Sequence, residues 1–391
     1  MQTNKMKNNK RIQLHQVGIF SRLLCWLMVF VLTLTACRSK RTQDLGWAKS
    51  DYGAEIAKRL TDLGARPAGS SACKQAADII NEEFQKLGYQ PELQAVSGLG
   101  DNVIVKIPGY GLRYNRKDYS KARKLALGKH LGQREGAAIV MARYTTVSGE
   151  NVTEANGLSD NAASIGALLT LAKQLKTQKI GYDVVLVALC SNQTEGAQTL
   201  LNSLSAAEKE HLSVVYELRN IFGGSRLYAH SGWSSLNKEE KYQHRLPVYQ
   251  IVDLALEEGL GSKHSPFESI YTNQAGFMVA SPLNKAENVV YREFTLNTSD
   301  YRVFDEAGID TVYIESWNYF GKNLEEIKQT DSRLYAESNG LIAGTNFDNY
   351  TKLLENSSAE QLSKRINSSA FIVLKALYKG ALDSQPNTLN Y

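Results

Sequence analysis

Cysteine and histidine are scarce in this chain of 391 residues, which has four cysteines and six histidines. After position 37 only Cys73 and Cys190 remain, and two cysteines cannot form the disulfide framework of a small secreted domain. No histidine follows His264. The residues after position 264 therefore offer no imidazole, which is the commonest metal ligand in proteins.

An excess of one charge sign is also missing from most of the chain. The formal net charge is +5, but residues 1–36 contain five basic side chains and no acidic one. The remainder holds 40 basic and 40 acidic side chains, so the positive charge gives no reason to expect a nucleic-acid partner. A hydrophobic content of 43% with 22% charged residues is that of an ordinary soluble globular protein.

The N-terminus has no apolar run long enough to cross a bilayer. The uncharged run Leu23–Ala36 follows a basic segment and has the length of a signal-peptide core. A buried helix is the alternative. The run ends in Leu34-Thr35-Ala36-Cys37, which resembles the lipobox of bacterial lipoproteins. This resemblance implies a signal peptide over 1–36, a lipid on Cys37 and a tether over 37–49. We therefore expect a protein anchored in the cell membrane on its extracytoplasmic side.

Residues 137–173 organise the rest of the sequence. The unbroken apolar run Ala137–Ala142 predicts a strand covered on both faces. A polar loop follows and ends in Ser159-Asp160-Asn161, after which apolar residues recur at helical spacing. Asp160 therefore lies near a helix N-terminus, where it could be a simple cap or part of a functional site.

Further elements are predicted along the chain by the same signals. Helices are predicted over 51–63, 71–87, 247–261 and 370–378, and strands over 102–107, 184–189, 214–224 and 311–314. Residues 110–136 carry eight basic side chains against two acidic ones. They predict a surface insertion, or alternatively a contact with anionic lipid or an anionic wall polymer.

The order of these motifs resembles the core of the M28 zinc peptidases. Matching stretches are Leu63–Ser70, Arg143–Thr145, Gly157–Ser164, Cys190–Gly196, Val214–Gly224, Thr298–Ile309 and Gly344–Asp348. The resemblance covers roughly residues 50–380. It implies one domain over 50–385 with an α/β fold, in which a central mixed, mostly parallel sheet lies between helical layers.

The family's metal ligands are mostly replaced in this sequence. By the resemblance, the five zinc-ligand positions hold Arg143, Asp160, Gln193, Asn220 and Gly344, and only Asp160 keeps the residue type. The position of the general base holds Asn192, and an amide cannot take a proton from water at neutral pH. The full set of predicted cleft residues is Arg143, Asp160, Asn161, Asn192, Gln193, Asn220, Asp300 and Tyr301, the last in place of a histidine.

Two functions follow from these replacements, while a third, a metal-free enzyme, has no Ser/His or Cys/His pair with motif support. The first is a non-catalytic protein without a cofactor that binds a peptide, glycan or protein partner in the former cleft. In that case we expect Arg143 to pair with Asp160 where a metal charge would stand. The alternative is an active aminopeptidase with zinc or another metal on relocated ligands, Asp160 among them. The candidates are Asp160, Glu195, Asp300 and Asp348, an oxygen set that suits Mg²⁺ or Ca²⁺ better than Zn²⁺.

Overall fold

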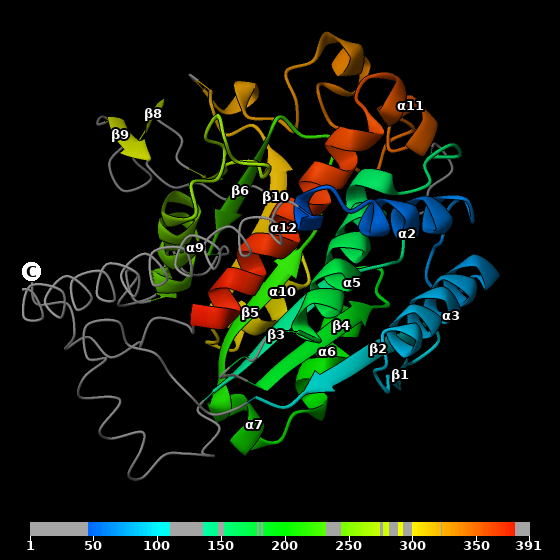
Figure 1. The fold of residues 1–391 in the computed structure, drawn as a ribbon. Coiled ribbons are helices and arrows are strands. Elements are labelled where there is room, and N and C mark those ends of the chain that lie inside the picture. Colours follow the sequence, from blue (N-terminus) through cyan, green and yellow to red (C-terminus); the bar gives the residue numbers. More distant parts are fainter. Residues whose placement is uncertain are drawn as a thin grey trace, which may run out of the picture. The chain divides into compact units, whose positions relative to one another are not determined.

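Eight strands form one mixed sheet in the order β1-β2-β4-β3-β5-β10-β6-β7 (Figure 1). The strands are β1 (Glu92–Val96), β2 (Gly100–Ile107), β3 (Ala137–Arg143), β4 (Asp183–Leu189), β5 (Leu212–Leu218), β6 (Arg226–His230), β7 (Ile270–Thr272) and β10 (Thr311–Trp317). Strand β3 pairs in parallel with β4 and β5, β10 with β5, and β6 with β7. The pairs β1–β2, β2–β4 and β6–β10 are antiparallel. A separate antiparallel pair joins β8 (Phe277–Ala280) to β9 (Asn288–Tyr291).

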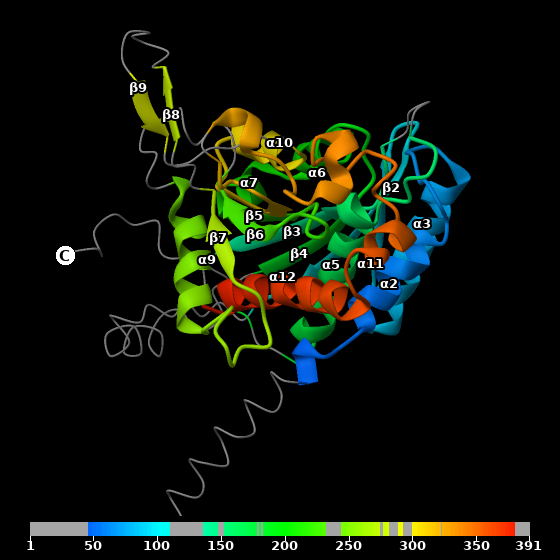
Figure 2. The ribbon, with the colours of Figure 1, turned by 90° about the horizontal axis from the view of Figure 1, so that it is seen from above.

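Helices cover both faces of the sheet (Figure 2). One face carries α2 (Tyr52–Thr61), α3 (Ser71–Lys86), α5 (Ala163–Leu175), α9 (Leu246–Glu257) and α12 (Ala359–Lys379). The other carries α6 (Glu195–Ser203), α7 (Ala206–His211) and α10 (Tyr301–Glu306), while α11 (Tyr350–Glu355) precedes α12 in the chain. The predicted layered α/β fold with a mixed, mostly parallel sheet is confirmed.

This computed structural model describes residues 46–109, 136–147, 152–177, 180, 183–231, 244–273, 277–280, 288–291, 299–321 and 323–379. The chain forms two units, Met1–Lys49 and Ser50–Tyr391. In the first unit only residues 46–49 are described, and they form a helical turn. The predicted signal peptide 1–36, Cys37, most of the tether 37–49 and residues 110–135 of the basic insertion lie outside the described residues. Among those described, no helix is both long and apolar enough to cross a membrane.

Local sequence explains where the main elements begin and end. Helix α3 begins after Ser70, whose hydroxyl accepts a hydrogen bond from the Cys73 amide at 3.0 Å. Before α5 the chain makes a π-helical turn, Leu158–Ala162, and Gly157 at its start has a φ of 67°. Strand β5 ends at Leu218, earlier than the predicted 224, because Asn220 turns into the left-handed region with a φ of 52°.

The closing helix α12 is much longer than the predicted 370–378, because it begins at Ala359. Its first half buries polar side chains, which hide the apolar periodicity on which the prediction depended. These buried polar residues are Ser363, Arg365, Asn367, Ser368 and Ser369.

Candidate functional site

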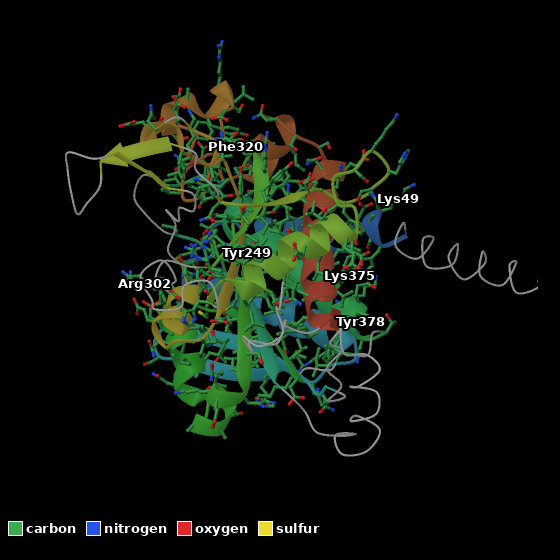
Figure 3. The ribbon with its side chains drawn as sticks, turned by 90° about the vertical axis from the view of Figure 1, so that its left-hand side faces the viewer. Lys49, Tyr249, Arg302, Phe320, Lys375 and Tyr378 are labelled. Atoms are coloured by element: carbon green, nitrogen blue, oxygen red, sulfur yellow. The ribbon has the colours of Figure 1, made fainter. Side chains whose placement is uncertain are left out.

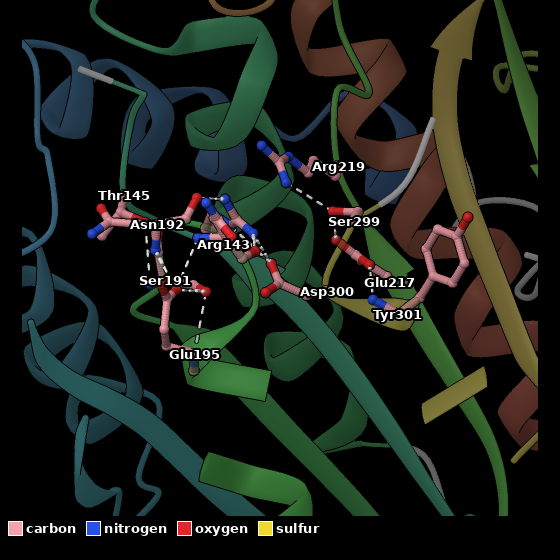
Figure 4. Close-up of polar contacts among 12 residues, drawn as sticks. Arg143, Thr145, Ser191, Asn192, Glu195, Glu217, Arg219, Ser299, Asp300 and Tyr301 are labelled. Carbon is pink, nitrogen blue, oxygen red and sulfur yellow. Dashed lines mark hydrogen bonds and ion pairs between the residues drawn. The ribbon is translucent and has the colours of Figure 1, made fainter. Parts of the chain in front are cut away.

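The side chain of Arg143 leaves the end of β3 toward α10 and is 3% exposed as a residue. Its Nε and Nη2 atoms lie 2.8 and 2.7 Å from Oδ2 of Asp300, the fully buried residue before α10. The guanidinium also donates to the backbone carbonyls of Asn192, at 2.8 Å, and Gln193. Figure 4 shows it held between the loop after β4 and the start of α10. Arg143 is therefore a buried cation in which every guanidinium nitrogen has a hydrogen-bonding partner.

Asp160 has a different arginine as its partner. Nε of Arg219, directly after β5, lies 3.0 Å from Asp160 Oδ1, and Nη1 donates to Ser299 Oγ at 2.8 Å. Burial alone would lower the pKa of Arg219, but Asp160 and the neighbouring acidic groups outweigh it and raise that pKa. The predicted pairing of Arg143 with Asp160 is thus wrong.

Strand geometry explains the exchange of partners. Side chains two positions apart on a strand point to the same face. Ile139 and Met141 of β3 belong to the apolar cluster that packs against α6 and α10, and Arg143 continues that series. Asp160 lies instead at the start of α5, which covers the opposite face. Arg143 consequently points toward Asp300, whereas Arg219, which lies just beyond the end of β5, contacts both Asp160 and Ser299 at the edge of the sheet.

Glu217 of β5 connects the Arg219–Asp160 and Arg143–Asp300 ion pairs through the segment Ser299–Tyr301. Its carboxylate accepts hydrogen bonds from Ser299 Oγ at 2.5 Å and from the Tyr301 amide at 2.6 Å (Figure 4). Burial, reinforced by the nearby charge of Asp300, raises the pKa of Glu217 to about 7. Sequence reasoning missed both Glu217 and Arg219. The signal available was their spacing of two in Glu217-Leu218-Arg219, which places both on the α10 face.

The loop that contains Gly344 reaches the start of α5 through Asp348. The Asp348 carboxylate accepts hydrogen bonds from the amides of Ser159 at 2.6 Å and Asp160 at 3.1 Å. Burial and the adjacent charge of Asp160 raise the pKa of Asp348 to about 7. This loop therefore meets the Ser-Asp-Asn stretch, as the family resemblance implied.

Asn161 is held by a second arginine that sequence reasoning did not single out as a site residue. Arg66 is fully buried, and its Nη2 donates to Asn161 Oδ1 at 2.5 Å. Its other nitrogens donate to four backbone carbonyls, which belong to Leu60, Gly64, Tyr144 and Asn156. Burial lowers the pKa of Arg66 to about 10. Asn161 thus lies inside a packed polar cluster and is itself fully buried.

The side chains of Asn192 and Gln193 are exposed at the edge of the sheet. Glu195 organises their loop. Its carboxylate accepts hydrogen bonds from the backbone amides of Asn192 and Gln193, at 3.0 and 2.8 Å, and from Ser191 Oγ. Burial opposes the charge of Glu195, but these N–H donors outweigh it and keep its pKa below the ordinary glutamate value. Glu195 is committed to the loop, so it is a poor candidate for a relocated base.

Two predicted positions differ in character from the rest. Tyr301 does not line an open cleft, because its ring is fully buried in the apolar core. The centroids of the Tyr301 and Tyr313 rings are 5.1 Å apart. Gly344 lies on a shallow hollow of about 500 Å³. The hollow is lined by Val152, Glu154, Glu337, Ser338, Gly344, Thr345, Asn346, Phe347 and Lys352.

Two buried oxygens of the site accept no hydrogen bond from any described residue. They are Oδ1 of Asp300, which is fully buried, and Oδ1 of Asn220, which is 8% exposed as a residue. A buried acceptor without a donor is costly in free energy, so a ligand that brings a donor would be stabilised there.

The residues present do not fit a zinc ion. Zinc sites combine three or four Cys, His, Asp or Glu ligands. Within the described part of the chain, no three such side chains lie close enough together to hold a metal ion. The carboxylates of Asp160 and Asp300 already face guanidinium groups, and the amides of Asn192, Gln193 and Asn220 are weak zinc donors.

Comparison with known proteins shows the fold. No family model matches the chain. The "Alkaline phosphatase isozyme conversion protein" of Escherichia coli (strain K12) is 26% identical over 281 residues, or 69% of this chain and 72% of that protein. A zinc aminopeptidase from Bacillus subtilis is similar in structure, with a TM-score of 0.53 at 14% identity over 86% of this chain and 97% of that chain. Tannerella forsythia glutaminyl cyclase gives a TM-score of 0.52 at 12% identity, over 84% and 98%. The resemblance to the M28-type aminopeptidase fold is thus confirmed.

Proposed function

We propose that this chain, which has the fold of M28-type zinc aminopeptidases, is a non-catalytic, metal-free protein that binds a peptide segment at the edge where β3 and β5 end. It would do so as a lipoprotein, anchored through Cys37 outside the cytoplasm. The observation that carries the proposal is the pair of buried arginines. Arg143 and Arg219 neutralise Asp300 and Asp160, the carboxylates that a metal would need.

The residues at the site also argue against peptidase chemistry. Hydrolysis requires a base within hydrogen-bonding reach of the attacking water. The base position holds the amide of Asn192, and the nearby carboxylate of Glu195 is bonded to its own loop. No other carboxylate of the site lacks a partner: Asp348 accepts two backbone amides at the start of α5.

A peptide matches the hydrogen-bonding groups that this edge offers. Oδ1 of Asn220, whose residue is 8% exposed while Asp300 is fully buried, needs a donor, and a backbone N–H group of a peptide supplies one. The exposed side-chain amides of Asn192 and Gln193 can both donate hydrogen bonds to a peptide backbone and accept them from it. The hollow beside Gly344–Phe347 could receive a side chain of the ligand. We favour a peptide over a glycan because the fold is shared with aminopeptidases.

Metal content and activity test the non-catalytic part of the proposal. The purified protein should contain no stoichiometric zinc by plasma mass spectrometry. It should cleave no aminoacyl anilide and cyclise no N-terminal glutamine. Because no metal is bound to the native state, EDTA should leave its melting temperature unchanged. Stoichiometric zinc, together with a melting temperature that EDTA lowers and zinc restores, would support the metallopeptidase instead.

Asn220→Gly tests the binding part. Glycine adopts the φ of 52° without strain, so the variant should keep its fold while it loses the unpaired Oδ1 acceptor. With a library of fluorescent pentapeptides, we expect saturable binding that weakens about tenfold in this variant, the cost of one hydrogen bond of about 1.4 kcal/mol. Gln198→Ala, on the exposed face of α6, is the control and should bind normally. Equal binding by Asn220→Gly and the parent would place the ligand elsewhere.

A further inference from the structure

Two cysteines from distant parts of the chain meet in the interior. Cys73 lies in the first turn of α3 and Cys190 directly after β4, 117 positions apart. Their Sγ atoms are 3.7 Å apart, and the residues are 1% and 0% exposed. Their separation along the chain does not predict this contact.

The surroundings leave room for both sulfur atoms. A Cβ atom at Gly100 would lie 3.0 Å from Cys190 Sγ and 3.5 Å from Cys73 Sγ, so a side chain at that position would press on the pair. The hydroxyl of Tyr144 lies 3.8 Å from Cys73 Sγ and is held by the Asp101 carbonyl at 2.7 Å. The carbonyl of Leu99 faces both sulfurs, at 3.8 Å from Cys73 and 3.4 Å from Cys190.

We propose that Cys73 and Cys190 form an intramolecular disulfide bond by exchange with a disulfide-bonded oxidant such as oxidised glutathione. The sulfur atoms would close from 3.7 Å to about 2.05 Å as the bond forms. The proposal does not depend on the function of the site.

The exchange is balanced in two steps. The Cys73 thiolate attacks one sulfur of oxidised glutathione and releases one glutathione thiolate. The Cys190 thiol then loses its proton and attacks Cys73 Sγ, which releases the second glutathione. The protein loses two protons and two electrons, and the disulfide of the oxidant becomes two thiols.

The exchange takes place while the chain is folding or locally open, because the oxidant cannot reach sulfurs that are buried in the folded protein. As the two cysteines come together, Cys73 is suited to the first attack. Its sulfur accepts a hydrogen bond from the Cys190 thiol, which outweighs burial and lowers the pKa of Cys73 to about 6. Its place in the first turn of α3 favours the thiolate further. The same interaction raises the pKa of Cys190, which remains the protonated partner until the mixed disulfide forms.

The bond would join α3 to the loop that holds Arg143. Cys190 immediately precedes that loop, whose carbonyls at Asn192 and Gln193 accept from the Arg143 guanidinium. A disulfide there would restrict the end of β4 against α3. It would form where thiols are oxidised, as in the extracytoplasmic compartment that the N-terminus predicts.

The experiment uses the full chain with Cys25→Ser and Cys37→Ser, so that only Cys73 and Cys190 remain. It is folded in buffers with increasing ratios of oxidised to reduced glutathione, then unfolded in an alkylating reagent. We expect the mass to fall by about 2 Da, both thiols to escape alkylation and one digest peptide to link Cys73 with Cys190. The oxidised form should melt several degrees higher than the reduced form.

Cys190→Ser in the same background is the matched control. It has no internal partner, so its single thiol should remain free or carry glutathione, and its melting temperature should not rise on oxidation. The proposal is overturned if the parent keeps two alkylatable thiols at every ratio, or if it ends as a stable glutathione adduct without the linked peptide. Both readouts come from the parent protein, so they hold even if the control folds poorly.

Discussion

At the scale of single residues, two arginines determine the electrostatics of the site. Arg143 and Arg219 each face a carboxylate that is almost completely buried. A buried ion pair contributes little net stability compared with apolar residues, because both charges lose their hydration. Removing one partner alone is far more costly, since it leaves a buried charge without compensation.

The pair Arg143–Asp300 should therefore show strong coupling in a double-mutant cycle. Arg143→Met and Asp300→Asn should each lower the free energy of unfolding by about 3–5 kcal/mol. The double variant should recover part of that loss and give a coupling energy above about 1 kcal/mol. Chemical denaturation of the four proteins measures this energy.

An exposed ion pair on α10, the helix that follows Asp300, provides the control. Arg302 and Glu306 lie 2.6 Å apart with side chains 51% and 55% exposed, and Arg302 projects from the surface (Figure 3). Their coupling should stay near about 0.5 kcal/mol or less. Additivity of the two buried substitutions within about 0.5 kcal/mol would mean that Arg143 does not depend on Asp300.

The raised pKa of Asp348 predicts how stability changes with pH. Between about pH 4 and 7 the folded protein binds a proton at Asp348, whereas the unfolded chain, with an aspartate pKa of about 3.9, releases it. The free energy of unfolding contributed by this group therefore falls as the pH rises through that range. Asp348→Asn should reduce the fall between pH 5 and 7, measured by denaturant titration. Asp62→Asn, at an exposed carboxylate, should leave the fall unchanged.

At the scale of helices and strands, apolar pattern and capping residues predicted the existence of the main elements. Helix α3 ends within one residue of the prediction, and β3 begins where its apolar run begins. Which carboxylate each arginine meets could not be predicted. A strand buried on both faces is apolar throughout, so its sequence did not reveal that Arg143 faces α10.

Close packing of helices at two glycines gives an element-scale prediction. A Cβ at Gly166 of α5 would lie 2.3 Å from the backbone oxygen of Gly53 in α2. Gly166→Ala improves helix propensity by about 1 kcal/mol, but it forces the two backbones apart at a typical cost of about 1–3 kcal/mol. We expect a net loss of stability in thermal or chemical unfolding. Gly46→Ala, in a helical turn with no atom within 4 Å, should change stability by less than about 0.5 kcal/mol. A stabilising Gly166→Ala would show that the helices separate easily.

At the scale of the whole molecule, the fold and the metal site have different requirements. The sheet and its helices depend on buried apolar residues, and these persist although four of the five expected ligand positions hold other residue types. The order of motifs was therefore enough to predict the fold from the sequence. The partners of the replaced residues required the three-dimensional arrangement, since Arg219 and Glu217 lie in no matched ligand position.

The last prediction concerns the localisation of the protein and the lipid expected on Cys37. Cys37 follows a basic segment, an uncharged core and Leu-Thr-Ala, the pattern on which a bacterial lipoprotein is cleaved and lipidated. When the full gene is expressed in a bacterium with a labelled fatty acid, we expect the label on the protein and the protein in the membrane fraction. Cys37→Ala should lose the label, because the acyl acceptor is gone. Cys25→Ala, within the predicted leader, should keep it, since that residue would be removed with the signal peptide. A labelled Cys37→Ala protein, or an unlabelled parent that is exported in soluble form, would contradict the anchor.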